Sequence, residues 1–260
     1  RLPRDDAETT WGIYPHFSFT GSDGESRFAE SVMVINRLLC ETAAILAIIR
    51  SGEVPFLDAT YYLLEALDRV RSCREKMAGL VKTPFPKAFQ AMRDHLVPLR
   101  VGGQIYEPPN ATYLPGWAKV DAAIGTYDER WRHALQSRLN HMPRHERDQI
   151  VIELLQPSLA QIVEDVVGEK IHKRSIAELT LDRPELEQPL FAVQALAREH
   201  AVLLHGVHLG AIKKNLPKEE ENSGGDGPLH GQDQGVSGRS IAETEELRNM
   251  RAAHWLARLK

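Results

Sequence analysis

Cysteine, aromatic residues and long apolar runs are scarce in this sequence of 260 residues. Two cysteines, Cys40 and Cys73, exclude a disulfide-stabilised scaffold and are expected to be small buried residues with no chemical role. The 32 Lys and Arg residues form no block and are outnumbered by 36 Asp and Glu residues, which argues against a nucleic-acid partner. The longest apolar run, residues 42–49, is far shorter than the ~20 residues of a membrane span. The first ten residues lack the apolar segment of a signal peptide, so we expect a cytoplasmic protein with no membrane partner.

Several motifs that carry catalytic or metal chemistry are also missing. The sequence has no His-Glu-x-x-His zinc motif, no glycine-rich phosphate loop, no Cys-x-x-Cys-His haem-attachment motif and no nucleophile elbow. A helical di-iron site needs two Glu-x-x-His pairs, and this pattern occurs once, as Glu169 and His172. A solvated helix end is the simpler interpretation of that pair.

Apolar residues at helical spacing are plentiful. Spacings of three and four residues predict helices over most of the chain, and Pro157 is expected to kink or divide the helix over residues 144–167. No alternating pattern longer than about four residues favours a strand. Because no polar linker precedes residue 215, we expect an all-α fold with residues 1–260 as a single helical domain. The other predicted helices span residues 26–50, 55–79, 86–95, 117–139, 191–214 and 240–259.

Histidine occurs 11 times, and His200 has the most distinctive position. It lies in the apolar stripe of the helix over residues 191–214, which is apolar on nearly every side and is expected at the centre of the fold. On a regular helix His205 and His208 face other directions, so only one of the three imidazoles can occupy a given site. A core histidine with a hydrogen-bonded neighbour and an axial ligand of haem iron are the two interpretations. The apolar stripe favours His200, with His205 and His208 as rivals.

Three further features are candidates for function. His95 points inward on its predicted helix, and it is either a core residue or a distal acid–base group. The segment over residues 100–116 is rich in turn-forming residues, and long loops of this kind tend to be functional. The glycine-rich segment over residues 215–239 leads into the last helix, whose exposed N–H groups favour an anion. A plain connection is the alternative interpretation of such a glycine-serine segment.

These features together resemble the histidine-ligated haem-dependent aromatic oxygenases, the superfamily of tryptophan dioxygenase and indoleamine dioxygenase. Members carry a proximal histidine in a buried helix, then a long loop and a Gly-Thr-Gly-Gly-type turn that opens a C-terminal helix. Here Gly235-Val236-Ser237-Gly238 follows His200 by about 35 residues, with Val and Ser at the second and third positions of the turn. The resemblance covers about 60 residues, Phe191 to Leu256. The sequence most resembles the bacterial haem-dependent L-tyrosine hydroxylases. In those enzymes the distal histidine lies about a hundred residues before the proximal one, and here His95 lies about 105 residues before His200.

The resemblance implies a helical bundle of the tryptophan dioxygenase type, with haem b held non-covalently between helices. His200 is then the axial ligand of the haem iron and His95 the catalytic residue. The implied reaction hydroxylates L-tyrosine, or a related aromatic amino acid, at the ring ortho position to give 3,4-dihydroxyphenylalanine in secondary-metabolite (antibiotic) biosynthesis. The oxidant is hydrogen peroxide, or dioxygen with a reductant. The expected substrate-binding residues are Tyr106, Asn110, Ser237, Gly238 and Arg239, and the expected assembly is a homo-oligomer, by default a homodimer.

Three alternatives stay open on the sequence alone. One is a ring-cleaving tryptophan or indole 2,3-dioxygenase, which adds two oxygen atoms rather than one. Another is a non-catalytic helical protein that binds or senses haem. The third is a helical interaction protein without a cofactor.

Overall fold

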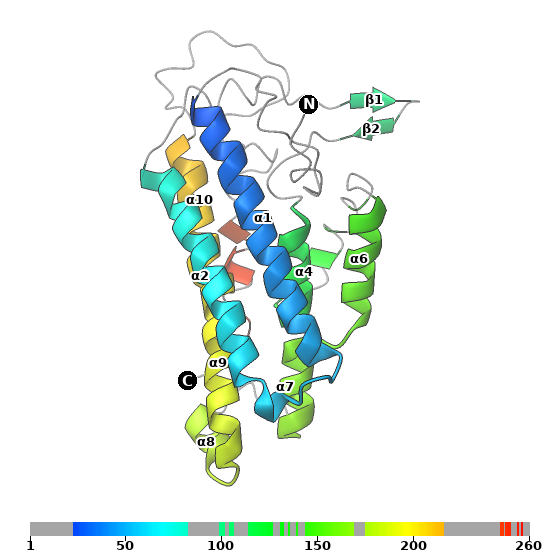
Figure 1. Cartoon of the computed structure of the whole chain (residues 1–260), viewed down its shortest axis with the longest axis vertical. Helices are drawn as coiled ribbons and strands as arrows, with labels where there is room; N and C mark the ends of the chain where they lie inside the picture. Colours follow the sequence, from blue (N-terminus) through cyan, green and yellow to red (C-terminus); the bar gives the residue numbers. More distant parts are fainter. Residues whose placement is uncertain are drawn as a thin grey trace, which may run out of the picture.

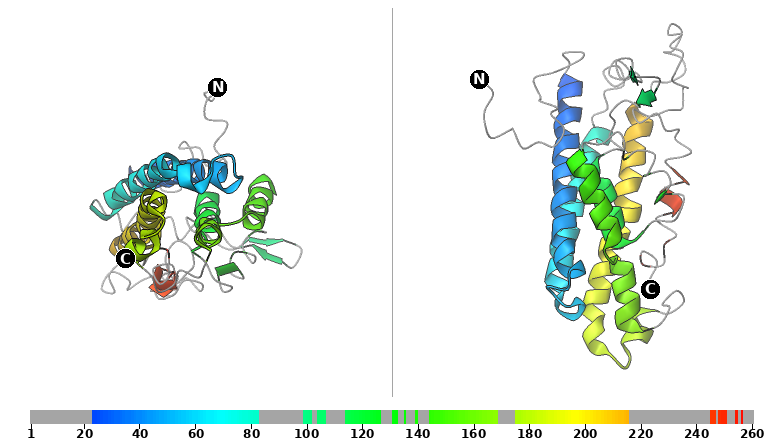
Figure 2. Two further views of the ribbon diagram at one scale, coloured as in Figure 1. Left: turned by 90° about the horizontal axis from the view of Figure 1, so that it is seen from below. Right: turned by 90° about the vertical axis from the view of Figure 1, so that its right-hand side faces the viewer.

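The chain forms a bundle of helices in two layers, described here from a computed structural model (Figures 1 and 2). The structure describes residues 23–82, 99–101, 104–106, 114–126, 131–132, 135, 139, 144–168, 175–215, 245–246, 248–250, 254 and 256, with the backbone alone for residues 99–101, 104–106 and 215. The long helices α1 and α2 form one layer, and the remaining helices pack beneath it (Figure 2).

The first layer is an antiparallel pair, α1 (Asp23–Arg50) and α2 (Thr60–Lys82), joined by a short 3₁₀ turn, η2 (Phe56–Asp58). Apolar side chains at helical spacing face the core, and Ile35, Leu39 and Leu46 are completely buried. Burial of each such side chain contributes about 1.5–3 kcal/mol to stability. Helix α1 ends where Gly52 adopts φ +80° and its N–H donates to the carbonyl of Ile49, as a glycine terminator should.

The second layer has two components that lie side by side (Figure 2). One is α4 (Pro115–Ile124), which packs against α1 and α6. The other is a continuous rod in which a π-helical turn, η5 (Glu199–Leu204), joins α9 (Glu187–Arg198) to α10 (His205–Asn215) and packs against α2. The remaining elements are α6 (Arg144–Leu155), α7 (Leu159–Val167), α8 (Ile176–Thr180) and η4 (Pro184–Leu186).

The expectation of a mainly helical chain is confirmed, with one small addition. A short antiparallel hairpin, β1 (Leu99–Val101) and β2 (Gln104–Tyr106), lies in the segment predicted as a loop. The break at Pro157 is also confirmed. Helix α6 ends at Leu155, and Ser158 caps α7 through a reciprocal pair of hydrogen bonds with Gln161. The tryptophan dioxygenase-type arrangement and the single domain stay predictions.

The expected central helix needs correction. The segment over residues 191–214 is not buried all round, because Phe191 and Leu203 are 49% and 39% exposed. Every residue of α4 is buried instead, including Lys119 and Asp121. The spacing of apolar residues predicts too little burial for α4, because the helix is short and its two charged residues are neutralised inside the bundle. Lys119 donates to Glu146 over 2.8 Å and also to Gln149, both on α6.

Gly116 sets how closely α4 approaches α1. A Cβ atom at this position would lie 2.6 Å from Cβ of Leu39 and 2.9 Å from the carbonyl oxygen of Asn36. We therefore expect Gly116→Ala to lower the free energy of unfolding by about 1–3 kcal/mol, measured by urea titration. The control is Gly79→Ala on α2, where nothing lies within 4 Å of the added atom. That change should stabilise by about 0.5–1 kcal/mol, and equal effects of the two substitutions would contradict the close contact.

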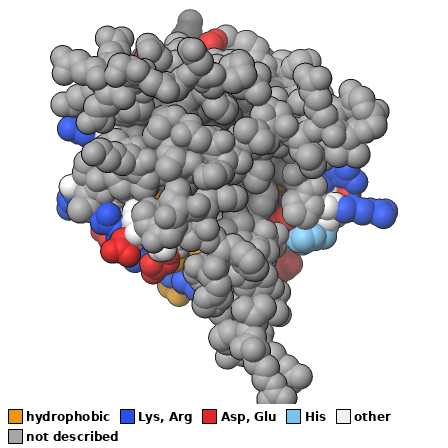
Figure 3. Space-filling view, turned by 90° about the horizontal axis from the view of Figure 1, so that it is seen from above, with side chains coloured by type: hydrophobic (Ala, Val, Ile, Leu, Met, Phe, Trp, Pro, Cys, Tyr) orange, Lys and Arg blue, Asp and Glu red, His pale blue; other side chains and the backbone are white. Residues whose placement is uncertain are grey.

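Within the described residues, α1 is the one helix that is long and apolar enough to cross a membrane by length and composition. The side of α1 that carries Leu39 and Leu46 packs into the bundle. A helix that lies in a protein core passes the same test of length and composition. The view from above shows charged side chains of both signs at the rim among the described residues (Figure 3). The expectations of a cytoplasmic location and of no membrane partner therefore stay predictions.

Candidate functional site

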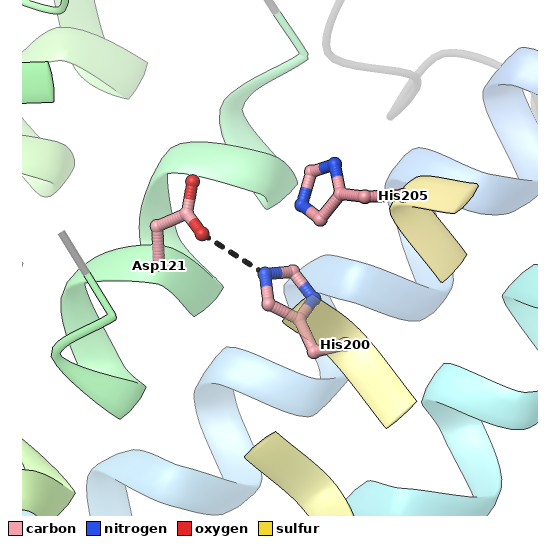
Figure 4. Close-up of side chains that lie close together, drawn as sticks. All are labelled: Asp121, His200 and His205. Carbon is pink, nitrogen blue, oxygen red and sulfur yellow. Dashed lines mark hydrogen bonds and ion pairs between the residues drawn. The ribbon is translucent and has the colours of Figure 1, made fainter. Parts of the chain in front are cut away.

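The candidate site lies between α4 and the π-helical turn η5, where Asp121, His200 and His205 face one another (Figure 4). His200 is 0% exposed, Asp121 1% and His205 7%. The prediction that His200 is buried is thereby confirmed. A cluster of three buried groups with oxygen or nitrogen donors needs an explanation, because polar groups are stable in a core only when they are paired.

The π-helical turn brings the two histidines together. Five residues along a regular α-helix correspond to about 140° of rotation beyond one full turn, so His200 and His205 would face apart. A π-helix bonds residues five apart, which carries His205 to nearly the same side as His200. Their ring centroids lie 5.1 Å apart with the rings edge to face. The expectation that the imidazoles face different directions is therefore wrong, because it assumes an unbroken α-helix.

A carboxylate on α4 meets the first of these rings. Oδ1 of Asp121 lies 3.0 Å from Nε2 of His200, and Nε1 of Trp131 donates to Oδ2 of the same carboxylate over 3.1 Å. An ionised carboxylate can only accept hydrogen bonds, so the proton of the imidazole is on Nε2. The lone pair of the neutral ring is then on Nδ1, which is buried and has no hydrogen-bond partner among the described residues.

Trp117 forms a wall of the site. It precedes Asp121 by four residues on α4 and therefore lies on the same face of that helix. Its ring centroid is 4.5 Å from that of His205, 5.7 Å from that of His208 and 5.8 Å from that of His200. One indole thus contacts three imidazoles.

Ion pairs of two buried carboxylates hold both sides of the site. Glu199, the first residue of the π-helical turn, is 4% exposed and is paired with Arg74 and Arg71 on α2. Lys119, two residues before Asp121 in the sequence, is tied to α6 through Glu146. The turn that carries His200 and the helix that carries Asp121 are therefore each fixed to a neighbour by a charge-assisted contact.

Most of the other predicted site residues lie outside the part of the chain that the structure describes. His95, Asn110, Ser237, Gly238 and Arg239 lie outside the described residues, as do Glu169 and His172. Tyr106 is the last residue of β2, and its side chain is not described. The proposed active-site loop over residues 215–239 lies outside the described residues except for Asn215, which ends α10. The roles proposed for these residues stay predictions.

Three residues of the site are absent from the sequence-based prediction, namely Trp117, Asp121 and Trp131. A signal for Asp121 exists, because it is a lone carboxylate between Val120 and the apolar run of Ala122, Ala123 and Ile124. A single acid in such a segment is buried and must be paired. Its partner cannot be read from periodicity, since His200 lies 79 residues away in the chain.

The two cysteines take no part in the site. Burial raises the pKa of the Cys40 thiol, and it raises that of the Cys73 thiol to about 12 from an ordinary 9.0. At pH 8 the thiolate form of Cys73 should be about 1000-fold less populated than the thiolate form of a free cysteine. The reason is that the thiolate population falls about tenfold for each unit by which the pKa rises.

We therefore expect native protein to react slowly with Ellman's reagent, and urea-unfolded protein to react at once. Because the pKa of Cys73 is higher in the folded chain, its contribution to stability is complete below about pH 9 and is lost as the pH rises towards 12. Rapid labelling of Cys73 in folded protein would contradict this account.

Comparison with protein-family models and with curated proteins finds no match to this chain. The family suggested by the sequence therefore stays a proposal.

Proposed function

We propose that this chain is a haem-dependent oxygenase that hydroxylates L-tyrosine, or a related aromatic amino acid, at the ring ortho position. The observation that carries the proposal is the buried pair of Asp121 and His200, in which one ring nitrogen faces a carboxylate and the other has no described partner. Histidines that bind metals usually donate their second ring N–H to a carboxylate or a carbonyl. The identities of the cofactor and of the substrate are inferred from the resemblance of residues 191–256 to haem oxygenases.

The donor chemistry of His200 fits an axial ligand. A neutral imidazole is the usual proximal ligand of haem iron in several haem protein classes, and either ring nitrogen of a histidine can bind a metal. The neighbours of His200 on the rod, Leu196, Ala197 and Leu204, are apolar and 0% exposed, and this apolar wall of the rod is the kind of surrounding in which a haem ligand lies. Haem, when bound, supplies the activation of peroxide or of dioxygen.

The residues of the chain then have separate tasks. Asp121 fixes the orientation of the His200 ring and makes it a stronger donor, and Trp131 fixes Asp121. Trp117 and the apolar wall exclude water from the centre. We propose that His95 moves a proton at the phenol oxygen of the substrate, which makes the ortho carbon richer in electrons.

The substrate contacts are proposed from sequence position. Tyr106 and Asn110 follow His95 in the chain and are proposed to line the substrate pocket. Ser237, Gly238 and Arg239 are proposed to hold the substrate carboxylate or a haem propionate at the start of the last helix.

Product analysis separates this proposal from its alternatives. Haem-loaded protein incubated with L-tyrosine and hydrogen peroxide should yield 3,4-dihydroxyphenylalanine, detected by mass spectrometry as one added oxygen. Two added oxygens with an opened ring, from tryptophan or indole, would favour the dioxygenase. Bound haem without turnover of any aromatic amino acid would favour a haem-binding or sensor protein.

His95→Ala is the matched test of the catalytic role. It should keep the haem absorption spectrum and lower turnover by about 10²–10⁴-fold, the usual contribution of a general acid or base. Unchanged turnover in this variant would remove His95 from the mechanism while leaving the ligand role of His200 intact.

A further inference from the structure

Three donors of the site, one each from Asp121, His200 and His205, lie within 4.8 Å of one another. Two ligands at about 2.1 Å from one ion are about 3.0–3.4 Å apart when adjacent and about 4.2 Å apart when opposite. The 3.0 Å between Oδ1 of Asp121 and Nε2 of His200 is already the spacing of adjacent ligands. The limit of 4.8 Å for the whole set is larger than the spacing of opposite ligands, so His205 would have to move inward to complete the set.

We infer that Asp121, His200 and His205 form a site for a single divalent transition-metal ion bound directly by the protein. Two imidazoles and one carboxylate suit iron(II), cobalt(II) or zinc(II), whereas magnesium and calcium prefer oxygen ligands. Three protein ligands leave coordination positions open, which is the arrangement of non-haem iron(II) centres with two histidines and one carboxylate. Binding of a bare ion here requires neither haem nor tyrosine chemistry.

The π-helical turn is the independent observation that favours this site. An axial ligand of haem needs one imidazole, and a regular α-helix would present His200 alone. The irregular turn η5 instead carries His205 to within 5.1 Å of His200, measured between ring centroids. Such turns are rare in proteins and are frequent at functional sites. The ion pairs of Glu199 with Arg74 and Arg71 hold the turn in place.

The outer contacts also suit a directly bound ion. Trp131 donates to Oδ2 of Asp121 and leaves Oδ1 directed at His200. Partners that orient ligands in this way typically strengthen metal binding by about 10–100-fold. An ion bound between Oδ1 of Asp121 and Nε2 of His200 would replace the proton that these two atoms share. A haem bound to His200 would instead leave that proton in place. The ion and the haem therefore exclude each other.

Cobalt(II) is a suitable probe, because its visible ligand-field bands report nitrogen and oxygen ligands. Full-length protein, freed of metal with a chelator and free of haem, is titrated with cobalt(II) chloride. We expect one ion per chain. Asp121→Asn and His205→Gln should each weaken binding by about 100-fold or more, since they remove or neutralise a ligand rather than an outer contact. His208→Gln is the matched control, because His208 also contacts Trp117 but is not one of the three donors; its affinity should stay within about threefold of wild type.

Each variant is compared with wild type by circular dichroism and by melting temperature without metal, so that loss of fold is not taken for loss of a ligand. Unchanged cobalt affinity in folded Asp121→Asn and His205→Gln protein overturns the inference, as does folded wild-type protein that binds no cobalt. Haem added to cobalt-loaded protein should displace the ion, and simultaneous binding of both would overturn the mutual exclusion. A haem spectrum that depends on His200, without cobalt binding, would leave the proposed function standing.

Discussion

Replacing His200 by alanine is expected to abolish ligation of haem iron. The imidazole is completely buried beside Asp121, and it is the side chain to which the proposed function assigns the iron. The Soret band of haem-reconstituted protein should shift to that of a histidine-free haem or disappear, and tyrosine turnover should fall below detection. In the proposed site His200 would supply the single protein bond to the iron, and its loss would be a larger change than the 10–100-fold effects that follow the loss of an outer partner.

Two companion variants make this result specific. His200→Gly with added imidazole should recover the ligated spectrum, because a free imidazole fits the space that the side chain leaves. His205→Ala should keep the haem spectrum while losing the directly bound cobalt ion. If His205→Ala or His208→Ala abolishes haem ligation while His200→Ala keeps it, the assignment of the axial ligand is wrong.

Replacing Arg50 by alanine is expected to produce the largest loss of stability, about 3 kcal/mol. The Arg50 side chain is 0% exposed and pairs with Glu153, whose side chain is 16% exposed. Its Nε also donates to the carbonyl oxygen of Pro157 over 2.8 Å. Arg50 thus joins the end of α1 to the break between α6 and α7. Removing one partner of a buried ion pair costs about 3–5 kcal/mol, and the partial exposure of Glu153 puts this case at the lower end.

Urea titration followed by circular dichroism measures the effect. The matched control is Arg37→Ala on the same helix, because the Arg37 side chain is 70% exposed and pairs with Glu41 on the surface. An exposed pair of this kind contributes about 0–1 kcal/mol. Equal losses in the two variants would mean that the buried contact of Arg50 does not hold the layers together.

The features that the sequence predicts well are those that depend on near neighbours. Pro157 divides two helices because a proline removes a donor and clashes with the preceding turn, and this holds in any surroundings. Gly52 and Gly168 end α1 and α7 with positive φ for an equally local reason. The burial of His200 follows from the apolar residues beside it on one helix face.

The features that the sequence does not predict depend on contacts between segments far apart in the chain, or on a departure from regular α-helical geometry. Asp121 meets His200 across 79 residues, and Trp131 meets Asp121 across 10 residues. The meeting of His200 with His205 depends on a π-helical turn, which a pattern based on α-helical spacing treats as regular. The position of α4 at the centre depends on neutralisation of Lys119 by Glu146, a contact that composition does not reveal.

The most direct test of the central claim is the absorption spectrum of wild-type protein after reconstitution with haem, read together with its iron content. The account predicts a Soret band of a histidine-ligated haem, with one iron per chain, that is absent from His200→Ala protein prepared in the same way. Folded wild-type protein with neither a Soret band nor bound iron would contradict the claim that His200 is a ligand of iron.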